Sequence, residues 1–246
     1  MSGQSNAKWP KRVPELSEEQ RRARDDWMHR FQESLPTEHR RLARFNNAYP
    51  LRSIVAQGRT LEIGAGLGEH LRYEELDRQE YHTIELRENM AEVIMRDFPS
   101  IQTTVGDCQE RLPFPADHFE RVLAIHVLEH LPNLPRALDE VKRVLRPGGI
   151  LSAVIPCEGG FGYSLGRKFT VRRQFERRYG IRYMPIIRSE HVNVPVEIFE
   201  EIAERFDIVD RTFYPLRVPI VHLNLVIGIT ARRSPELSRE EAASVR

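Results

Sequence analysis

The segment HVLEH, residues 126–130, places two histidines and a glutamate at the spacing H-x-x-E-H. On a helix, His126 and His130 would lie one turn apart and could hold a zinc ion, with Glu129 as the base beside them. No acidic motif downstream stands out as a third ligand on a matching helix. We therefore expect no metal site, and we interpret the spelling as a strand end that meets the start of a helix.

A glycine-rich turn, LEIGAGLG at residues 61–68, is the second stretch that could do chemistry. Glycines suit a sharp turn that a ligand must approach closely, because a β-carbon would block both. A dinucleotide fingerprint, G-x-G-x-x-G, would need a glycine where Glu69 stands. Glu62, just before the loop, would repel a pyrophosphate but suits a cationic or zwitterionic ligand. A nucleotide-dependent oxidoreductase of the NAD type is therefore the alternative and not the first hypothesis.

Two more acids follow predicted strands. Glu85 closes YHTIEL and Asp107 follows IQTTVG. Because open α/β sheets bind ligands beyond the carboxyl ends of their strands, we expect Glu62, Glu85 and Asp107 to lie at one site. A carboxylate at Glu85 could accept hydrogen bonds from both hydroxyls of a ribose.

The elements that must position these residues alternate between β-rich and helical runs from about residue 58. The pattern predicts strands at 59–63, 81–86, 101–106, 121–127 and 150–156, and helices at 69–76, 88–97 and 135–145. This rhythm is typical of an α/β fold with a mostly parallel sheet and helices on both faces. A helix at 196–206 and strands at 207–216 and 221–231 follow. A loop joins the last two strands, so we expect them to pair antiparallel.

The remaining segments suggest a domain organisation. We predict a flexible N-terminus (1–16), a helical cap (17–50), a main domain (51–232) with a substrate-side insert (157–195), and a flexible tail (233–246). Ser17 to Gln20 form a capping box that opens the first helix. The cap should fold over the ligand as a lid, with residues 45–49 (FNNAY) close enough to touch it.

Composition narrows the class of protein. The chain has 246 residues, a formal net charge of +1 and two cysteines. The charge excludes a global basic field for nucleic acid, and two cysteines are too few for a disulfide framework. No signal-like segment or run of 18 apolar residues occurs. We therefore expect a soluble, cytoplasmic protein without stable membrane insertion.

Taken together and in this order, the motifs resemble those of the class I S-adenosylmethionine-dependent methyltransferases, most closely the small-molecule group. LEIGAGLGEH is similar to the first motif of that family, Glu85 to its ribose-binding acid, and residues 106–151 to its adenine-binding and fourth-strand region. The resemblance implies a Rossmann-like, seven-stranded, mostly parallel sheet whose last strand is antiparallel. It also implies S-adenosyl-L-methionine as cofactor and S-adenosyl-L-homocysteine as product.

The resemblance carries roles to individual residues. The methionine and ribose portions of the cofactor would lie against Gly64, Ala65, Gly66 and Gly68, with Glu62 near the methionine amino group. Asp107 would accept a hydrogen bond from the adenine amino group, and the backbone of Cys108 would cap the ring. Leu86 and Gln109 would flank the cofactor.

Three residues are candidates for catalysis: His126, His191 and Tyr163. His126 ends the fourth predicted strand, where an imidazole could take a proton from a hydroxyl or amine acceptor. The alternative is a histidine that only shapes the pocket. His191, in the polar run RSEHVN, is a second candidate base or a simple loop histidine. Alignment alone can suffice for many methyl transfers, because the sulfonium is already an activated donor.

The insert carries a local excess of positive charge. Between Gly166 and Arg188 it holds seven arginines and one lysine, against Glu176 as the only acid. One interpretation is a solvated helix face, and the other is recognition of an anionic acceptor, such as a phosphate-linked sugar or a lipid head group. An RNA acceptor is disfavoured because no separate binding module is visible. The acceptor is therefore expected to be a small molecule or a glycan- or lipid-linked one, and a non-catalytic cofactor-binding protein stays as an alternative.

Overall fold

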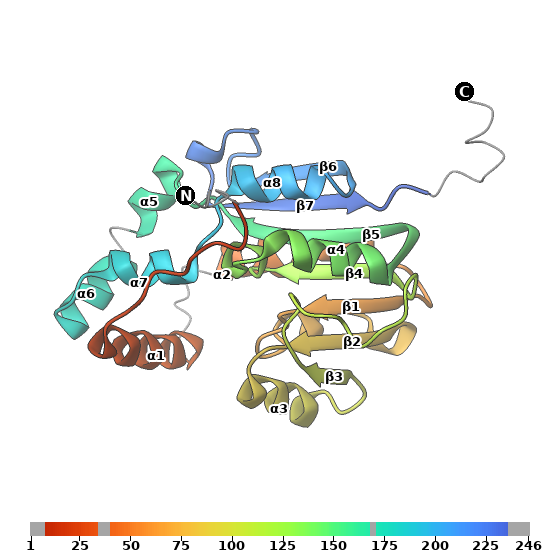
Figure 1. The fold of residues 1–246 in the computed structure, drawn as a ribbon, viewed down its shortest axis with the longest axis horizontal. Coiled ribbons are helices and arrows are strands. Elements are labelled where there is room, and N and C mark those ends of the chain that lie inside the picture. The colour runs from red at the N-terminus through yellow and green to blue at the C-terminus, as the bar shows by residue number, and fades with distance from the viewer. Residues whose placement is uncertain (1–7, 34–39, 168–170, 236–246) are drawn as a thin grey trace, which may run out of the picture.

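The computed structural model describes residues 8–33, 40–167 and 171–235, and it is built around a seven-stranded sheet (Figure 1). The strand order is β3-β2-β1-β4-β5-β7-β6. The strands are β1 (Arg59–Ile63), β2 (Glu80–Glu85), β3 (Gln102–Val105), β4 (Phe119–Ile125), β5 (Leu145–Pro156), β6 (Asp207–Tyr214) and β7 (Val226–Arg232). β7 pairs antiparallel with both β5 and β6, and the other pairs are parallel. The predicted fold class, with its antiparallel last strand, is confirmed.

The central strands are buried on both faces, which explains their near-continuous apolar sequence. Six of the seven residues of β4 are buried, and β5 is buried from Leu151 to its end. β5 starts earlier than predicted, at Leu145, and takes in the segment RPGG at residues 146–149. A register shift between Phe119 and Arg121 of β4 accommodates this longer strand.

Helices cover the sheet as the alternating pattern predicted. α4 (Leu134–Val144) and α8 (Pro195–Ala203) lie over one face, and α3 (Glu88–Asp97) packs beside β2 and β3 (Figure 1). α4 buries Leu134, Leu138 and Val141 completely, at the three- and four-residue spacing of an amphipathic helix. These side chains join the main hydrophobic core between α4, α8 and the sheet.

The helix predicted at 69–76 is wrong. Two short 3-10 turns, η3 (His70–Tyr73) and η4 (Leu76–Arg78), take its place. Between them Glu74 is extended, with φ −85° and ψ 151°, and its carboxylate turns inward to reach Arg121 of β4. A continuous helix would not offer this reach, so a long-range ion pair overrides the local helical preference.

Arg121 and Glu74 form a fully buried ion pair below the glycine loop. Both side chains are 0% exposed, and Arg121 Nη1 lies 3.1 Å from Glu74 Oε2. Arg121 also donates to the backbone oxygen of Pro50 (3.2 Å) and to Ser53 Oγ (3.2 Å) in η2 (Pro50–Ser53). His70 Nε2 lies 2.6 Å from Glu74 Oε1. The pair therefore ties η2 and η3 to the sheet.

This cluster predicts a loss of stability in acid. Burial alone would raise the pKa of Glu74, but the hydrogen bond with His70 and the Arg121 guanidinium outweigh it and lower the pKa from 4.5 to about 2. A depressed folded-state pKa contributes stability that is complete above the unfolded value of 4.5 and is lost as the pH falls toward about 2. We expect the urea-measured free energy of unfolding to decrease across this interval. Glu74→Gln should flatten that decrease, and an equally steep decrease in this variant would contradict the assignment.

The N-terminal helices have different neighbours. α1 (Glu18–Glu33) packs on α6 (Arg173–Tyr179) and α7 (Tyr183–Glu190), with the Trp27 and Phe175 ring centroids 5.5 Å apart. The predicted capping box is confirmed: Gln20 N donates to Ser17 Oγ (3.2 Å), and Ser17 N donates to Gln20 Oε1 (2.9 Å). α2 (Arg40–Ala48) instead lies against the sheet near β7. Within the described ranges, every helix is too short or too polar to cross a membrane.

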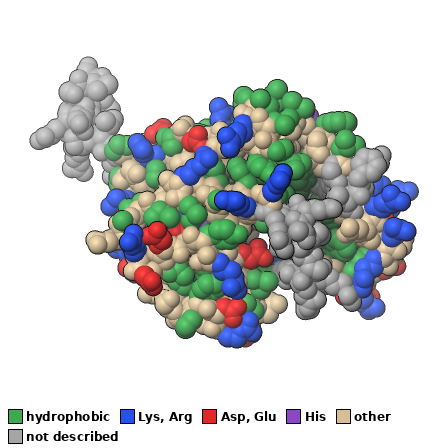
Figure 2. All heavy atoms as spheres, turned by 180° about the vertical axis from the view of Figure 1, so that it is seen from behind, with side chains coloured by type: hydrophobic (Ala, Val, Ile, Leu, Met, Phe, Trp, Pro, Cys, Tyr) green, Lys and Arg blue, Asp and Glu red, His purple; other side chains and the backbone are tan. Residues whose placement is uncertain are grey.

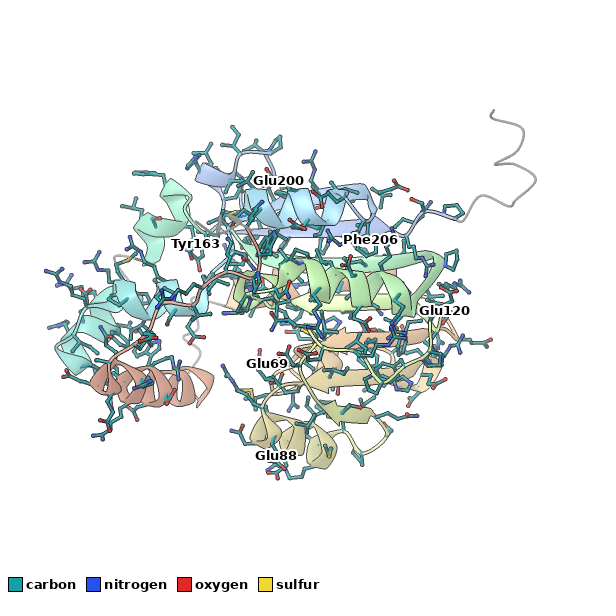
Figure 3. All side chains as sticks on the ribbon, in the orientation of Figure 1. Glu69, Glu88, Glu120, Tyr163, Glu200 and Phe206 are labelled. Atoms are coloured by element: carbon teal, nitrogen blue, oxygen red, sulfur yellow. The ribbon has the colours of Figure 1, made fainter. Side chains whose placement is uncertain are left out.

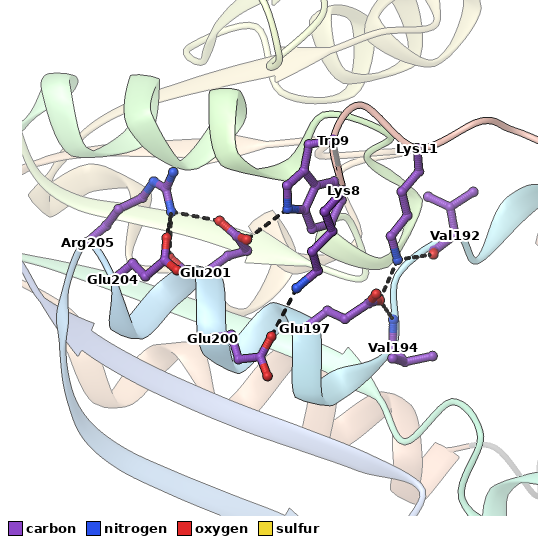
Figure 4. Close-up of polar contacts among 10 residues, drawn as sticks. All are labelled: Lys8, Trp9, Lys11, Val192, Val194, Glu197, Glu200, Glu201, Glu204 and Arg205. Carbon is purple, nitrogen blue, oxygen red and sulfur yellow. Dashed lines mark hydrogen bonds and ion pairs between the residues drawn. The ribbon is translucent and has the colours of Figure 1, made fainter. Parts of the chain in front are cut away.

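The segment before α1 runs along α8 (Figure 4). Lys8 Nζ lies 3.0 Å from Glu200 Oε2, Trp9 Nε1 donates to Glu201 Oε1 (2.8 Å), and Lys11 contacts Glu197. The sequence predicted a flexible N-terminus and gave no sign of these contacts, because their partners lie more than 180 residues away in the sequence.

Candidate functional site

A cavity of about 480 Å³ lies at the carboxyl ends of the parallel strands. Glu69 and Tyr163 lie toward this end of the sheet and Glu120 toward the other (Figure 3). The cavity brings together seven of the predicted site residues: Glu62, Gly64, Ala65, Gly66, His126, Tyr163 and His191. It therefore joins the glycine loop to the catalytic candidates, from β1, β4, α5 (Phe161–Arg167) and the segment after α7.

The glycine loop has the backbone that its sequence predicts. Gly64, Gly66 and Gly68 all have positive φ, at 63°, 57° and 73°. A β-carbon on Gly64 would also lie 2.5 Å from Val127 Cγ2, closer than van der Waals contact allows. The loop therefore needs glycine at its first position for both conformation and space.

The other predicted cofactor residues lie outside the cavity lining. Gly68 is in the glycine loop after β1, and the rest lie at or just after the ends of β2 and β3: Glu85, Leu86, Asp107, Cys108 and Gln109. Glu85 Oε2 accepts a hydrogen bond from Gly66 N (2.8 Å), which ties this acid to the glycine loop. Asp107 Oδ1 accepts from Gln109 N (2.8 Å). Burial raises the pKa of the Cys108 thiol to about 12, so this residue would contribute its backbone and not a thiolate. Their contacts with a cofactor stay predictions.

The charge of the cavity lining is negative. Glu62, Glu69 and Glu129 line it, and among the described residues neither lysine nor arginine does. Glu62 is 2% exposed and accepts a hydrogen bond from the Tyr81 hydroxyl (2.9 Å). Burial raises the pKa of Glu62 despite this bond. A bound cation would favour the ionised form of Glu62, so the site suits a positively charged ligand.

His126 has a strained backbone and a buried acidic partner. Its φ is 53°, a left-handed conformation that non-glycine residues rarely adopt and that occurs at functional sites. Its Nδ1 lies 3.1 Å from Glu129 Oε1, and its side chain is 33% exposed while that of Glu129 is 1% exposed. Burial raises the pKa of Glu129, but the bond with His126 and the nearby His130 and His191 lower it to about 2. An ionised carboxylate therefore orients the imidazole.

Two further histidines meet beside this pair. The ring centroids of His130 and His191 are 4.9 Å apart. The backbone nitrogens of Val192 (2.9 Å) and Asn193 (3.1 Å) donate to Glu129 O, which anchors the segment after α7 to η5 (Leu128–His130). The sequence singled out His191 but not its contact with His130, because the two residues are far apart in the sequence. The helix expected from Glu129 onward is a three-residue 3-10 turn, and α4 begins at Leu134.

α2 supplies cavity residues that the candidate list missed. Leu42, Ala43, Asn46 and Asn47 line the cavity. Asn46 Oδ1 is buried and has no hydrogen-bond partner within the described part of the chain. The FNNAY segment, which the sequence predicted to touch a ligand, supplies two of these residues, but its members have different neighbours. Its two asparagines face the cavity, whereas the Tyr49 ring packs where a β-carbon on Gly228 would lie only 2.5 Å away.

The arginines of the insert lie elsewhere. None of those with described side chains lines the cavity: Arg172, Arg173, Arg177, Arg178, Arg182 and Arg188. Arg172 pairs with Glu176 at 3.0 Å, and Arg178 lies 3.7 Å from Asp26 of α1. Lysine and arginine side chains gather at the edge of Figure 2 that corresponds to α1 and α6. Lys168 lies outside the described residues. The described positions favour a solvated helix face over contact with a ligand in the cavity.

Comparison with known proteins agrees with this geometry. Residues 61–153 match the family described as "Methyltransferase domain". A solved methyltransferase from Burkholderia thailandensis, a 1,6-didemethyltoxoflavin-N1-methyltransferase with bound 1,6-didemethyltoxoflavin and S-adenosylhomocysteine, superimposes with a TM-score of 0.57. It is 18% identical, and the match covers 91% of this chain and 93% of that one. At this identity the likeness establishes the fold.

Curated relatives match over shorter segments. A sterol 4-C-methyltransferase from Caenorhabditis elegans is 30% identical over 99 residues, which cover 36% of this chain and 28% of that protein. A malonyl-[acyl-carrier protein] O-methyltransferase from Halorhodospira halophila is 33% identical over 95 residues, covering 37% and 32%. The matched part of the chain thus spans about a third or less of these relatives. The family match, residues 61–153, is the part that holds the glycine loop and β4.

Proposed function

From the premise that residues 61–153 of this chain are a methyltransferase domain on a class I sheet, we propose that the protein is an S-adenosylmethionine-dependent methyltransferase. The observation that carries the proposal is the single cavity that joins the glycine loop to His126 and Glu129. Its acidic lining suits a cofactor that carries both a sulfonium and an ammonium group.

We assign the cofactor positions by residue. The glycine loop would hold the methionine portion, with Glu62 facing its ammonium group. Glu85 would bind the ribose and Asp107 the adenine amino group, with Leu86, Cys108 and Gln109 along the ring. The hydrogen bond from Gly66 N to Glu85 supports this arrangement, because it holds the ribose acid next to the loop.

The transfer itself needs a nucleophile in line with the methyl–sulfur bond. We propose His126 as the base that takes a proton from a hydroxyl or amine acceptor, with Glu129 orienting the imidazole and stabilising its protonated form. Tyr163 lies on the wall formed by α5, where it would contact the acceptor.

The acceptor is proposed to be a small molecule methylated on oxygen or nitrogen. The relatives and the solved structure are named for transfer to carbon, oxygen and nitrogen, so they do not select the acceptor atom. The proposal of oxygen or nitrogen rests on the His126–Glu129 pair. A base poised to remove a proton serves an O–H or N–H acceptor. A glycan- or lipid-linked acceptor would have to enter the cavity without contacting the described arginines of the insert there, because none of them lines it.

Both cysteines are free and buried, which supports the proposed cytoplasmic location.

Calorimetry with S-adenosylmethionine, S-adenosylhomocysteine and NAD tests the proposal. We expect both sulfur ligands to bind and NAD not to bind. NAD binding without a response to either sulfur ligand would contradict it in favour of an oxidoreductase. An acceptor screen by mass spectrometry, which detects the added methyl group, then separates an enzyme from a non-catalytic binding protein.

Removing the ribose acid should weaken cofactor binding. Glu85→Ala deletes a charge-assisted pair of hydrogen bonds to the ribose, and we expect the affinity for S-adenosylhomocysteine to fall by roughly 1.5–3 kcal/mol. Asp107→Ala should cost less, because backbone contacts to adenine remain. Since Glu85 also holds Gly66 N and Arg87 N, Glu85→Gln is the matched variant that keeps an acceptor for the loop. Parent-like affinity in a folded Glu85→Ala protein would refute the ribose assignment.

A further inference from the structure

Three side chains at one end of the cavity offer metal-ligand atoms at close range. A carboxylate oxygen of Glu129 and one ring nitrogen each of His130 and His191 lie within 4.8 Å of one another. All three residues line the cavity. Two imidazoles and a carboxylate are donors that divalent transition metals take in proteins. We propose that Glu129, His130 and His191 bind a divalent transition-metal ion in this cavity.

The contacts around the two histidines leave the correct nitrogen for such an ion. His130 Nδ1 lies 2.7 Å from the backbone oxygen of Glu190, which can only accept, so Nδ1 carries the proton and Nε2 the lone pair. His191 Nδ1 lies 2.9 Å from Glu158 Oε2, which favours the same tautomer. Histidines that bind metals usually donate their other N–H to a backbone carbonyl or a carboxylate in this way.

Glu129 has one oxygen to spare. Oε1 lies 3.1 Å from His126 Nδ1, whereas Oε2 is buried and has no hydrogen-bond partner in the described ranges. A buried carboxylate oxygen without a partner is costly in a side chain that is 1% exposed, and a bound cation would remove this cost.

A second cluster, formed by Glu80, His82 and His118, also has its ligand atoms within 4.8 Å of one another. It differs in its charges. Arg59 Nη1 lies 3.3 Å from His118 Nδ1, and the Glu80 side chain is 51% exposed. A guanidinium at that distance repels a cation, so this cluster serves as the control and not as a second site.

The role of the ion rests on the proposed function. An acceptor hydroxyl bound to such an ion would lose its proton more readily, and the proton would pass to the His126 imidazole. The oxygen lone pair then forms a bond to the methyl carbon as the carbon–sulfur bond breaks. The electron pair of that bond stays on sulfur, which leaves as the neutral thioether. His191 would thus be a ligand and not a base.

Titration of the full chain with Co²⁺, after dialysis against a chelator, tests the site. We expect one equivalent to bind with visible d–d absorption, and mass spectrometry of the dialysed complex should count one ion per chain. His130→Ala and His191→Ala should lose this absorption. His118→Ala, in the control cluster, should retain it. Unchanged Co²⁺ binding in the first two variants, loss in His118→Ala, or no binding by the parent would overturn the proposal.

Glu158→Gln supplies a test that leaves the three ligands in place. Loss of the carboxylate beside His191 Nδ1 should weaken Co²⁺ binding about 10–100-fold, and parent-like affinity would count against the site. S-adenosylhomocysteine calorimetry on the same samples verifies that each variant is folded. It also separates the two proposals. If the sulfur ligands bind and Co²⁺ does not, only the metal site is contradicted. If Co²⁺ binds and neither sulfur ligand does, only the proposed function is contradicted.

Discussion

Replacing His126 with alanine is expected to lower turnover by about 10²–10⁴-fold, the usual contribution of a positioned base. The affinity for S-adenosylhomocysteine should stay nearly unchanged, because the glycine loop and Glu85 hold the cofactor in our assignment. The structural reason is the 3.1 Å contact between His126 Nδ1 and the ionised Glu129, which fixes the imidazole within the cavity. Steady-state kinetics with the acceptor found by the screen measure the loss.

The separation of turnover from binding distinguishes a base from a residue that only shapes the cavity. His126→Ala should lose turnover while its affinity for S-adenosylhomocysteine stays near that of the parent. A variant that keeps most of its activity would mean that alignment and the reactivity of the sulfonium suffice. His118→Ala, at the opposite end of the sheet, is the matched control and should behave as the parent.

Arg121→Met is expected to lower the free energy of unfolding by about 3–5 kcal/mol, the cost of leaving one member of a buried ion pair without its partner. Arg121 and Glu74 are both 0% exposed, so water cannot replace the guanidinium. The backbone oxygen of Pro50 would lose a donor as well. Urea unfolding followed by two optical probes measures the change and checks that the transition is two-state.

Two further variants isolate the charge. Adding Glu74→Gln to Arg121→Met removes the unpaired carboxylate and should recover part of the lost stability. Arg136→Ala breaks an ion pair with Glu110 whose side chains are 51% and 63% exposed, and it should cost at most about 1 kcal/mol. Equal losses in Arg136→Ala and Arg121→Met would show that burial does not set the strength of the inner pair.

The sheet could be predicted from the sequence because its signals are local. Apolar runs mark the buried strands, and the loop between the last two strands predicts the antiparallel direction of β7. The same applies to the glycine turn, whose three left-handed residues follow from the spacing of its glycines. The helix at 69–76 failed because Glu74 pairs with a residue 47 positions away. An arginine in a strand covered on both faces was the available sign, since such a charge must be paired.

The residues of the candidate site could be predicted from the sequence, but the contacts between distant residues could not. His126, Glu129 and His130 are neighbours in the sequence, so their common location needed no structure. The structure was needed to show that His191 lies beside them. Asn193 holds the segment that contains His191 by donating hydrogen bonds to the backbone oxygens of Leu128 (2.7 Å) and Leu131 (2.8 Å). The zinc interpretation, with His126 and His130 as ligands, was set aside for want of a third ligand on a helix. The structure forms a different group, in which His191 from a loop joins Glu129 and His130.

The segment before α1 has a consequence for the order of folding during synthesis. Trp9 contacts Glu201, a separation of 192 residues, and α1 packs on α6 and α7. A ribosome releases the chain from its N-terminus, so residues 8–33 emerge long before the surfaces that receive them. β1 to β4 need only each other to pair, whereas this first segment must wait until α8 is complete. Closing so large a loop comes late, when most of the chain entropy has already been lost. We therefore expect residues 8–33 to dock among the last, which leaves them exposed to proteases and chaperones on the nascent protein for longer than β1 to β4.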